Sequence, residues 1–222
     1  FLRHMSHELK TPLANIREGT ELLLEGAVGG LSAEQREVGG ILRDNSLRLQ
    51  RLIENLLSYS EWHSRRGALD LDQVQLPALV SATLETYHLP ISAHRLQLVQ
   101  QVDDVTLVAD RAKLRLILDN LVSNAVKFTP DGGTITVRGR SEDGEVVIEV
   151  ADSGPGIPSA ERGRVFEAFY QGATPHGGLV RGTGIGLSVV QEFVQAHGGT
   201  IEIVDGEFSG AHFRVRLPIA IS

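Results

Sequence analysis

The sequence of 222 residues contains no cysteine, which excludes disulfide bonds, thiolate metal sites and cysteine nucleophiles. It has no apolar run near the ~20 residues needed to span a bilayer, and no signal peptide is visible. Acidic residues outnumber basic ones by 28 to 21, so the formal net charge is −7. This charge argues against a broad basic surface for nucleic acid, and any site for a polyanion must therefore be local.

The composition along the chain divides it into two parts. The length suits one large domain or two small ones, and the composition changes near residues 64–71. We therefore expect one domain over residues 1–66 and a second over residues 67–222. Because Phe1 lies inside a predicted helix, we expect the chain to be a trimmed piece of a longer protein.

The first part shows the spacing of two long helices, over residues 1–25 and 33–63. Pro12 is expected to bend the first helix, since it removes a backbone hydrogen bond. One hairpin cannot bury apolar stripes of this length, so we expect a four-helix bundle formed by two chains. The apolar face predicted for the second helix consists of Val38, Ile41, Leu42, Asn45, Leu49, Leu52, Ile53, Leu56 and Leu57.

Two local features mark the second helix. Ser32 followed by Gln35 predicts a capping box at its start. Gly39 and Gly40 each cost about 1 kcal/mol relative to Ala in a helix interior. They indicate either a soft spot or a close contact between helices.

The second part mixes helix and strand patterns and predicts an α+β fold, a mostly antiparallel sheet with helices over one face. Helices are expected over 77–88, 111–128 and 186–197, and strands over 74–76, 96–102, 105–109, 134–140, 146–152, 200–204 and 211–217. Residues 153–182 are rich in Gly and Pro and are expected to form a long loop. Such a loop in a compact domain is usually functional or mobile.

The helix over residues 111–128 carries a polar stripe on an otherwise apolar sequence. Asn120, Asn124 and Lys127 fall at i, i+4 and i+7, on one face. Two amides and an ammonium along one stripe suit a phosphate chain with a divalent cation, because Mg²⁺ takes one or two protein oxygens and keeps its waters. The alternative is an ordinary solvated face, although Asn is a poor helix former.

Two glycine-rich stretches follow. Asp152 ends a strand and opens the segment DSGPGIP, where a buried carboxylate suits an exocyclic amine such as that of adenine. Read alone, this segment fits a tight turn with a capping Asp equally well. Arg181–Leu187, RGTGIGL, leads into a helix and presents backbone N–H groups to an anion. It matches neither the dinucleotide nor the P-loop spacing, and its alternative is a flexible hinge.

His7 is two residues from Leu9 of the apolar stripe, so it is expected to project outward with Arg3 and Thr11. A neutral imidazole is a competent nucleophile near neutral pH. A lone exposed histidine, however, usually has no function.

Together and in this order, these stretches resemble bacterial sensor histidine kinases over essentially the whole chain. The segments resemble the H box (residues 7–12), N box (119–130), G1 box (152–156), F box (166–170) and G2 box (182–187) of that family. The segment NIREG, residues 15–19, is similar to a QseE-like branch. The resemblance implies a helical dimerisation and phosphotransfer domain followed by an α/β-sandwich ATP-binding domain of the Bergerat (GHKL) type.

The resemblance also implies roles for single residues. His7 would attack the γ-phosphate of ATP, Glu8 would act as general base, and Thr11 would help to place water in a phosphatase reaction. Asn124 would bind Mg²⁺. The remaining nucleotide-binding positions would be Asn120, Lys127, Phe128, Asp152, Gly154, Gly156, Ile157, Arg181, Gly182, Thr183, Gly184, Gly186 and Leu187. The implied partners are a second copy of the chain and the receiver domain of a response regulator, with no nucleic acid. The resemblance further implies that the chain is the cytoplasmic portion of a bacterial inner-membrane protein and makes no membrane contact itself.

Three rival interpretations share parts of this pattern. GHKL ATPases carry a hydrolytic Glu one turn before the Mg²⁺-binding Asn, where this chain has Asn120. Serine kinases of the anti-sigma type lack the helical hairpin with its H box. A degenerate scaffold is disfavoured by the intact Asn124, Asp152 and glycines.

Overall fold

A computed structural model describes residues 2–64, 69–172 and 184–220. Within these ranges the side chains of residues 2–10, 44, 48, 51, 52 and 54–64 lie outside the description, as does the predicted outward projection of His7. The chain separates into two compact units, residues Phe1–Gly67 and Ala68–Ser222. We describe each unit by itself.

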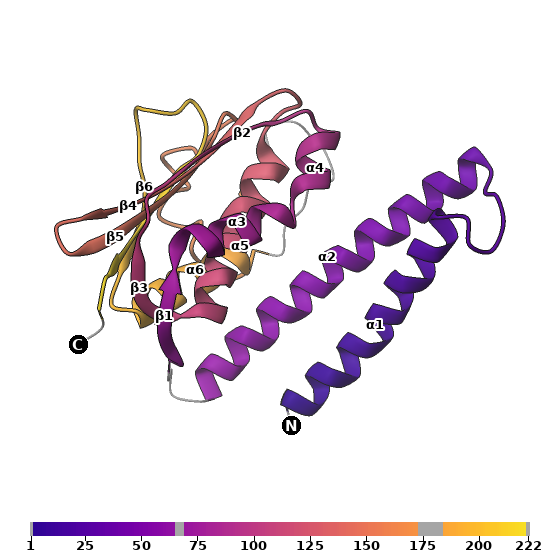
Figure 1. The fold of residues 1–222 in the computed structure, drawn as a ribbon, viewed down its shortest axis with the longest axis horizontal. Coiled ribbons are helices and arrows are strands. Elements are labelled where there is room, and N and C mark those ends of the chain that lie inside the picture. The colour runs from indigo at the N-terminus through magenta and orange to yellow at the C-terminus, as the bar shows by residue number, and fades with distance from the viewer. Residues whose placement is uncertain (1, 65–68, 173–183, 221–222) are drawn as a thin grey trace. The chain divides into compact units, whose positions relative to one another are not determined.

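The first unit is a helical hairpin of α1 (Leu2–Leu24) and α2 (Ala33–Ser64) (Figure 1). The predicted capping box is confirmed, because Gln35 N–H donates to Ser32 Oγ (3.2 Å) and Ser32 N–H donates to Gln35 Oε1 (2.9 Å). α1 runs on through Pro12, and a bend there stays a prediction.

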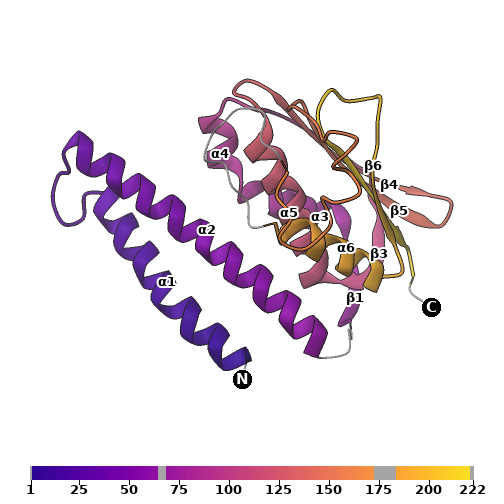
Figure 2. The same cartoon turned by 180° about the vertical axis from the view of Figure 1, so that it is seen from behind.

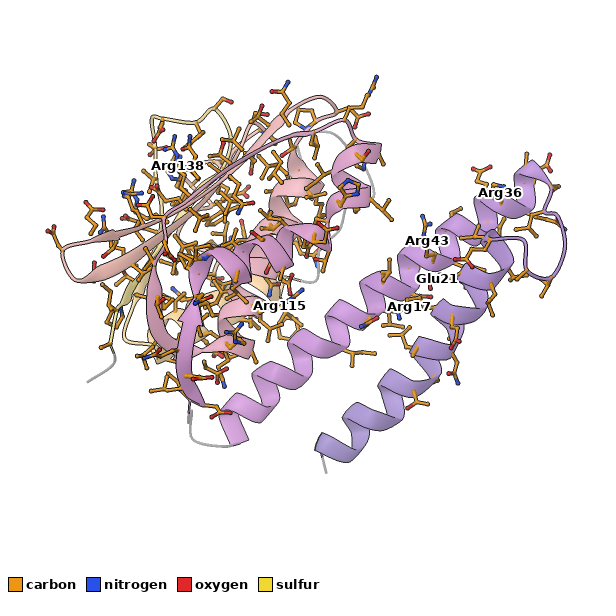
Figure 3. The ribbon with its side chains drawn as sticks, in the orientation of Figure 1. Arg17, Glu21, Arg36, Arg43, Arg115 and Arg138 are labelled. Atoms are coloured by element: carbon orange, nitrogen blue, oxygen red, sulfur yellow. The ribbon has the colours of Figure 1, made fainter. Side chains whose placement is uncertain are left out.

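Polar contacts join the two helices of the hairpin. Arg17 of α1 donates to Gln50 Oε1 (3.3 Å), and Arg36 of α2 donates to the Leu24 carbonyl (3.0 Å) (Figure 3). Both contacts link α1 to α2 across the apolar seam and fix their register.

Gly39 of α2 is buried at the contact with α1. A Cβ atom added there would lie 2.8 Å from Leu24 Cδ2, whereas one added at Gly40 would meet nothing within 4 Å. The sequence allowed two interpretations of this glycine pair, a soft spot or a close contact between helices. The structure shows the close contact at Gly39.

Replacing Gly40 with Ala is therefore expected to raise the free energy of unfolding by about 1 kcal/mol, through helix propensity alone. Replacing Gly39 with Ala should give no such gain, because Leu24 must move and overpacking costs about 1–3 kcal/mol. Chemical unfolding at one protein concentration compares the two variants. Equal stabilisation of both would contradict a close contact at Gly39.

The second unit is a layered α+β fold, as predicted. Its elements are β1 (Leu71–Gln75), α3 (Leu76–Glu85), α4 (His88–Ala93), β2 (Gln97–Val102), β3 (Thr106–Asp110), α5 (Arg111–Phe128), β4 (Thr134–Glu142), β5 (Glu145–Asp152), α6 (Gly186–Ala196), β6 (Thr200–Ile203) and β7 (His212–Pro218). A five-stranded sheet has the order β2-β4-β5-β7-β6, and β1 and β3 form a separate pair. α3, α5 and α6 lie on one side of the large sheet (Figure 2).

The strand pairing departs from chain order at β2 and β3. β2 pairs in parallel with β4, while β3 pairs antiparallel with β1. Asp103 and Asp104 therefore join strands of two different sheets. All other pairs in the large sheet are antiparallel, which agrees with the mostly antiparallel prediction.

The helix predicted over residues 77–88 is wrong at its end, because α3 stops at Glu85 and α4 follows as a separate helix. The N–H groups of Thr86 and Tyr87 turn back to carbonyls three residues earlier, at Thr83 and Leu84. This tighter turn ends α3 and redirects the chain into α4, which precedes β2.

α5 is the central helix of this unit. Its apolar face is fully buried between the sheet and the other helices, and consists of Leu114, Ile117, Leu118, Leu121, Val122 and Ala125. Asp110 caps its start by accepting from the N–H groups of Ala112 and Lys113, both at 3.1 Å. The charged side chain of Lys113 also pairs with Asp110. Each of these contacts fixes the axial position of α5.

A buried histidine ties α6 to the start of α5. His197 Nε2 accepts from the Asp110 N–H (3.0 Å), so the proton lies on Nδ1, which donates to the Phe193 carbonyl (2.6 Å). Burial lowers the pKa of His197. A neutral, fully bonded ring thus holds α6 against α5, and it is structural.

Candidate nucleotide site

The exposed end of α5 carries the predicted polar stripe. Asn120 donates through Nδ2 to the Leu116 carbonyl (2.8 Å), and Asn124 lies one turn further on, half-buried. Lys127 Nζ lies 4.4 Å from the centroid of the Phe128 ring, which is exposed. The stripe therefore presents amide and ammonium groups at the C-terminal half of one helix.

The start of α6 packs directly on this stripe. A Cβ atom added to Gly186 would lie 2.6 Å from Asn120 Oδ1, so only glycine allows α6 to approach so closely. Gly184 has a φ of +70° and its carbonyl accepts from the Phe169 N–H (2.8 Å). These contacts place the segments of the predicted N, F and G2 boxes side by side.

The segment after β5 crosses the C-terminal end of α5. A Cβ atom added to Gly154 would lie 2.6 Å from the Phe128 carbonyl oxygen, which again requires glycine. Gly156 has a φ of +72° and turns the chain towards Ile157. The G1 segment therefore lies against the same end of α5 as the polar stripe.

Asp152 is the buried acid of this region, with 6% of its surface exposed. Its Oδ1 atom accepts from the N–H groups of Gly154 (2.7 Å) and Ala211 (3.2 Å). Burial raises the pKa of Asp152, and the two N–H groups counter that effect. Among the described residues no hydrogen bond reaches Oδ2, so this oxygen is the acceptor that remains.

The predicted site residues divide into four groups by position. Eight of them meet at the end of α5 and its surroundings: Asn120, Asn124, Lys127, Phe128, Asp152, Gly154, Gly184 and Gly186. Leu187 follows in α6, and Gly156 and Ile157 follow Gly154. Arg181, Gly182 and Thr183 lie outside the described residues. His7 and Glu8 lie in α1 without described side chains, and Thr11 is exposed on α1.

Sequence reasoning missed Gly210 and Ala211, which complete the cradle of the acid. The Gly210 N–H donates to the Asp152 carbonyl (3.1 Å), and a Cβ atom on Gly210 would overlap the Asp152 carboxylate. The Ser-Gly pair before β7 signals a turn. Nothing in the sequence links that turn to an acid 58 residues earlier, because the link is made by strand pairing.

Comparison with known proteins identifies the protein family to which the chain belongs. Residues 109–221 match the family described as Histidine kinase-, DNA gyrase B-, and HSP90-like ATPase, and residues 1–65 match the His Kinase A (phospho-acceptor) domain. The chain belongs to this ATPase family and, with both domains present, to the sensor histidine kinases. The family predicted from the sequence is confirmed.

The relatives narrow the position within the family. The chain is 40% identical over 218 residues to the sensor histidine kinases QseE of Escherichia coli O157:H7 and GlrK of Escherichia coli K12. These matches cover 98% of the chain and 46% of each relative, so the chain spans about half of their length. The predicted likeness to QseE is thereby confirmed.

A solved structure agrees over the whole chain. Full-length ShkA in complex with AMPPNP superposes with a TM-score of 0.74 at 30% identity, covering 100% of this chain and 46% of ShkA. No helix in the described parts of the chain is long and apolar enough to cross a membrane.

Proposed function

We propose that this chain uses Mg²⁺-ATP to phosphorylate its own His7 and then passes the phosphoryl group to an Asp of a response-regulator receiver domain. The contact of Gly186 with Asn120 supports this proposal most directly. It brings the N-terminus of α6, with the N–H groups of its first turn, onto the amide and ammonium stripe of α5. N–H groups at a helix N-terminus bind phosphate.

In this proposal the base and the phosphates of ATP contact different parts of the site. Asp152 Oδ2 accepts a hydrogen bond from the exocyclic amine of adenine, with Phe128 and Ile157 beside the ring. Asn120 and Lys127 face the phosphate chain. Gly154 lets its segment lie against Phe128 O and Asp152 Oδ1, and Gly156 adopts the positive φ of the turn that follows, so both glycines shape the adenine edge.

The residues present fit a magnesium ion held mainly by the nucleotide. No cluster of three or more His, Asp or Glu able to hold a metal occurs among the described residues, and Mg²⁺ accepts a single amide oxygen beside phosphates and waters. Asn124 would supply that oxygen. When bound, the ion would neutralise charge on the transferring phosphate.

In this proposal, helix α1 supplies the residues that accept the phosphoryl group. One ring nitrogen of His7 attacks the γ-phosphorus, the P–O bond to ADP breaks, and an N–P bond forms. The other ring nitrogen releases its proton to Glu8, so the phosphorylated ring ends neutral. Thr11, one turn beyond His7, is proposed to place water for the reverse use of the site as a phosphatase of the regulator.

ATP is proposed to be kept for His7 because the site lacks a hydrolytic carboxylate. The position one turn before Asn124 is Asn120, whose Nδ2 donates to the Leu116 carbonyl. An amide held in this way cannot take a proton from water, whereas a glutamate there would. This difference favours the kinase over the related ATPases.

The two chains of a dimer are proposed to join through the hairpin. Its described residues expose many large apolar side chains: Ile16, Leu22, Leu23, Val28, Val38, Ile41, Leu42 and Leu49. Val38, Ile41, Leu42 and Leu49 belong to the stripe predicted for the second helix. A second hairpin would bury this stripe in a four-helix bundle. We further propose that the portion is cytoplasmic, below an inner-membrane sensor.

Replacing Ile41 with Glu should break this dimer, because a charge would enter an apolar bundle interface. Ile41 is 55% exposed in the single chain, so the monomer itself should remain folded. Light scattering after gel filtration is expected to show a monomer for Ile41→Glu and a dimer for the control Glu37→Gln. A dimeric Ile41→Glu variant would place the interface elsewhere.

The reaction itself is tested with γ-labelled ATP and Mg²⁺. A phosphoramidate on histidine should be lost in acid and retained in base. A label with the opposite stability would lie on a hydroxyl group and would exclude His7 as the acceptor.

A further inference from the structure

The segment 204–211, which we call the β6–β7 loop, joins β6 to β7 beside the end of β5. Antiparallel pairing puts the start of β7 next to the end of β5, with His212 opposite Ala151. The Asp152 N–H donates to the Ala211 carbonyl (2.9 Å), and the Ala211 N–H donates back to Asp152 Oδ1 (3.2 Å). One end of the loop is thereby fixed to the acid of the nucleotide site.

Arg162 holds the other end of the loop. Its Nη1 and Nη2 atoms donate to Asp205 at 2.5 and 2.6 Å, which makes a bidentate pair. Its Nε atom donates to the Ile157 carbonyl (3.1 Å). Because a forked guanidinium contact fixes orientation as well as distance, Arg162 ties the loop to the segment that follows Asp152.

These contacts close a ring around the acid. The ring runs from Asp152 through residues 153–157 to Arg162, across to Asp205, and back along the β6–β7 loop to Ala211. The Arg162 guanidinium lowers the pKa of Asp205, so the pair stays charged at neutral pH. Each side of the ring delivers one N–H group to Asp152 Oδ1.

A second attachment holds the middle of the loop on the outer face of the sheet. Arg138 of β4 pairs with Glu207 (2.5 Å), and its guanidinium lies 5.1 Å from the Phe208 ring (Figure 3). Phe208 in turn packs edge-on against His212, 4.9 Å between ring centroids. The loop is therefore held on the sheet by Arg138, and the Arg162–Asp205 pair links it to the segment that follows Asp152.

We propose that the Arg162–Asp205 pair is a strap that positions Asp152 for the exocyclic amine of adenine, so that both residues set the preference of the site for ATP. The inference rests on the proposed function. Oδ1 is held by one N–H group from each side of the ring, and a shift of either side turns the carboxylate. Oδ2 then moves away from the amine, although neither Arg162 nor Asp205 touches the base.

The test compares binding of Mg²⁺-ATP with binding of Mg²⁺-purine riboside triphosphate, which lacks the exocyclic amine. Titration calorimetry on the full chain gives both dissociation constants. Because a hydrogen bond to a charged group contributes about 1.5–3 kcal/mol, the wild type should prefer ATP by about tenfold or more. Asp152→Ala should abolish that preference. If Asp152→Ala keeps the preference for ATP, Asp152 does not accept a hydrogen bond from the adenine amine. The role proposed for Asp152 is then wrong, independently of the strap.

The strap is tested with Asp205→Ala and Arg162→Lys, the second of which keeps the charge but loses the fork. Both should weaken ATP binding by about fivefold and leave the purine riboside nucleotide within twofold. Asp205→Ala placed in the Asp152→Ala background should change ATP binding by less than twofold. The control Glu142→Gln alters ion pairs at the β4–β5 hairpin. It should bind both nucleotides with the affinities of the wild type.

Two results would overturn the strap. One is an equal loss for both nucleotides, which would make the pair a general support of the domain. The other is an unchanged ATP preference in Asp205→Ala and Arg162→Lys while Asp152→Ala loses it. Melting temperatures of every variant separate either result from simple unfolding.

Discussion

Replacing His7 with Gln is expected to abolish uptake of the γ-phosphate, with labelling reduced to background. Gln is similar in size and polarity but has no nucleophilic nitrogen, since its amide lone pair is delocalised. The proposed nucleotide site lies in the unit that begins at Ala68, so ATP binding should stay within twofold of the wild type. Radiolabelling followed by gel analysis measures the first quantity, and titration calorimetry measures the second.

His4→Gln is the matched control, because His4 lies one helical turn before His7 in the same helix. That variant should label like the wild type. Labelling of His7→Gln at the normal rate, or its loss in His4→Gln alone, would move the acceptor away from His7.

Replacing Asn124 with Ala is expected to lower labelling by on the order of 100-fold or more, the scale of losing one group that stabilises transition-state charge. The amide oxygen is the proposed protein ligand of Mg²⁺, and its loss leaves the transferring phosphate badly placed. Without Mg²⁺, nucleotide affinity should be unchanged. The gain in affinity that Mg²⁺ gives the wild type should disappear in the variant.

Two controls accompany Asn124→Ala. Gln100→Ala, on the edge strand β2, removes an amide whose Nε2 atom donates to Ser81 Oγ (3.1 Å), and it should label normally. The hairpin is untouched in both variants, so both should remain dimers by light scattering. An Asn124→Ala chain that still gains affinity from Mg²⁺ would refute the metal role.

Each rival interpretation of the sequence conflicts with an observation. A serine kinase without a phospho-acceptor hairpin does not account for the match of residues 1–65. A hydrolysing ATPase requires a carboxylate where the Asn120 amide donates to Leu116 O. A degenerate scaffold has no need of a buried acid whose Oδ2 atom accepts no hydrogen bond among the described residues.

Much of this protein was determined by its sequence alone. The 3.6-residue spacing predicted both long helices and α5, and alternation predicted most strands of the large sheet. The capping box at Ser32 and Gln35 was readable because its two residues are three apart. Such features depend on neighbours in the chain, so local patterns suffice to predict them. The five boxes identified the family for the same reason, since each is a short continuous segment.

Tertiary structure decided whatever depends on residues far apart in the chain. The parallel pairing of β2 with β4, the close contact at Gly39, and the approach of Gly186 to Asn120 arise only when elements pack. The ring of Asp152, Arg162 and Asp205 joins positions up to 53 residues apart. An acid at a strand end was visible in the sequence. The Gly154 N–H that holds its Oδ1 is local, but the second N–H, from Ala211, followed only from the antiparallel register of β5 and β7.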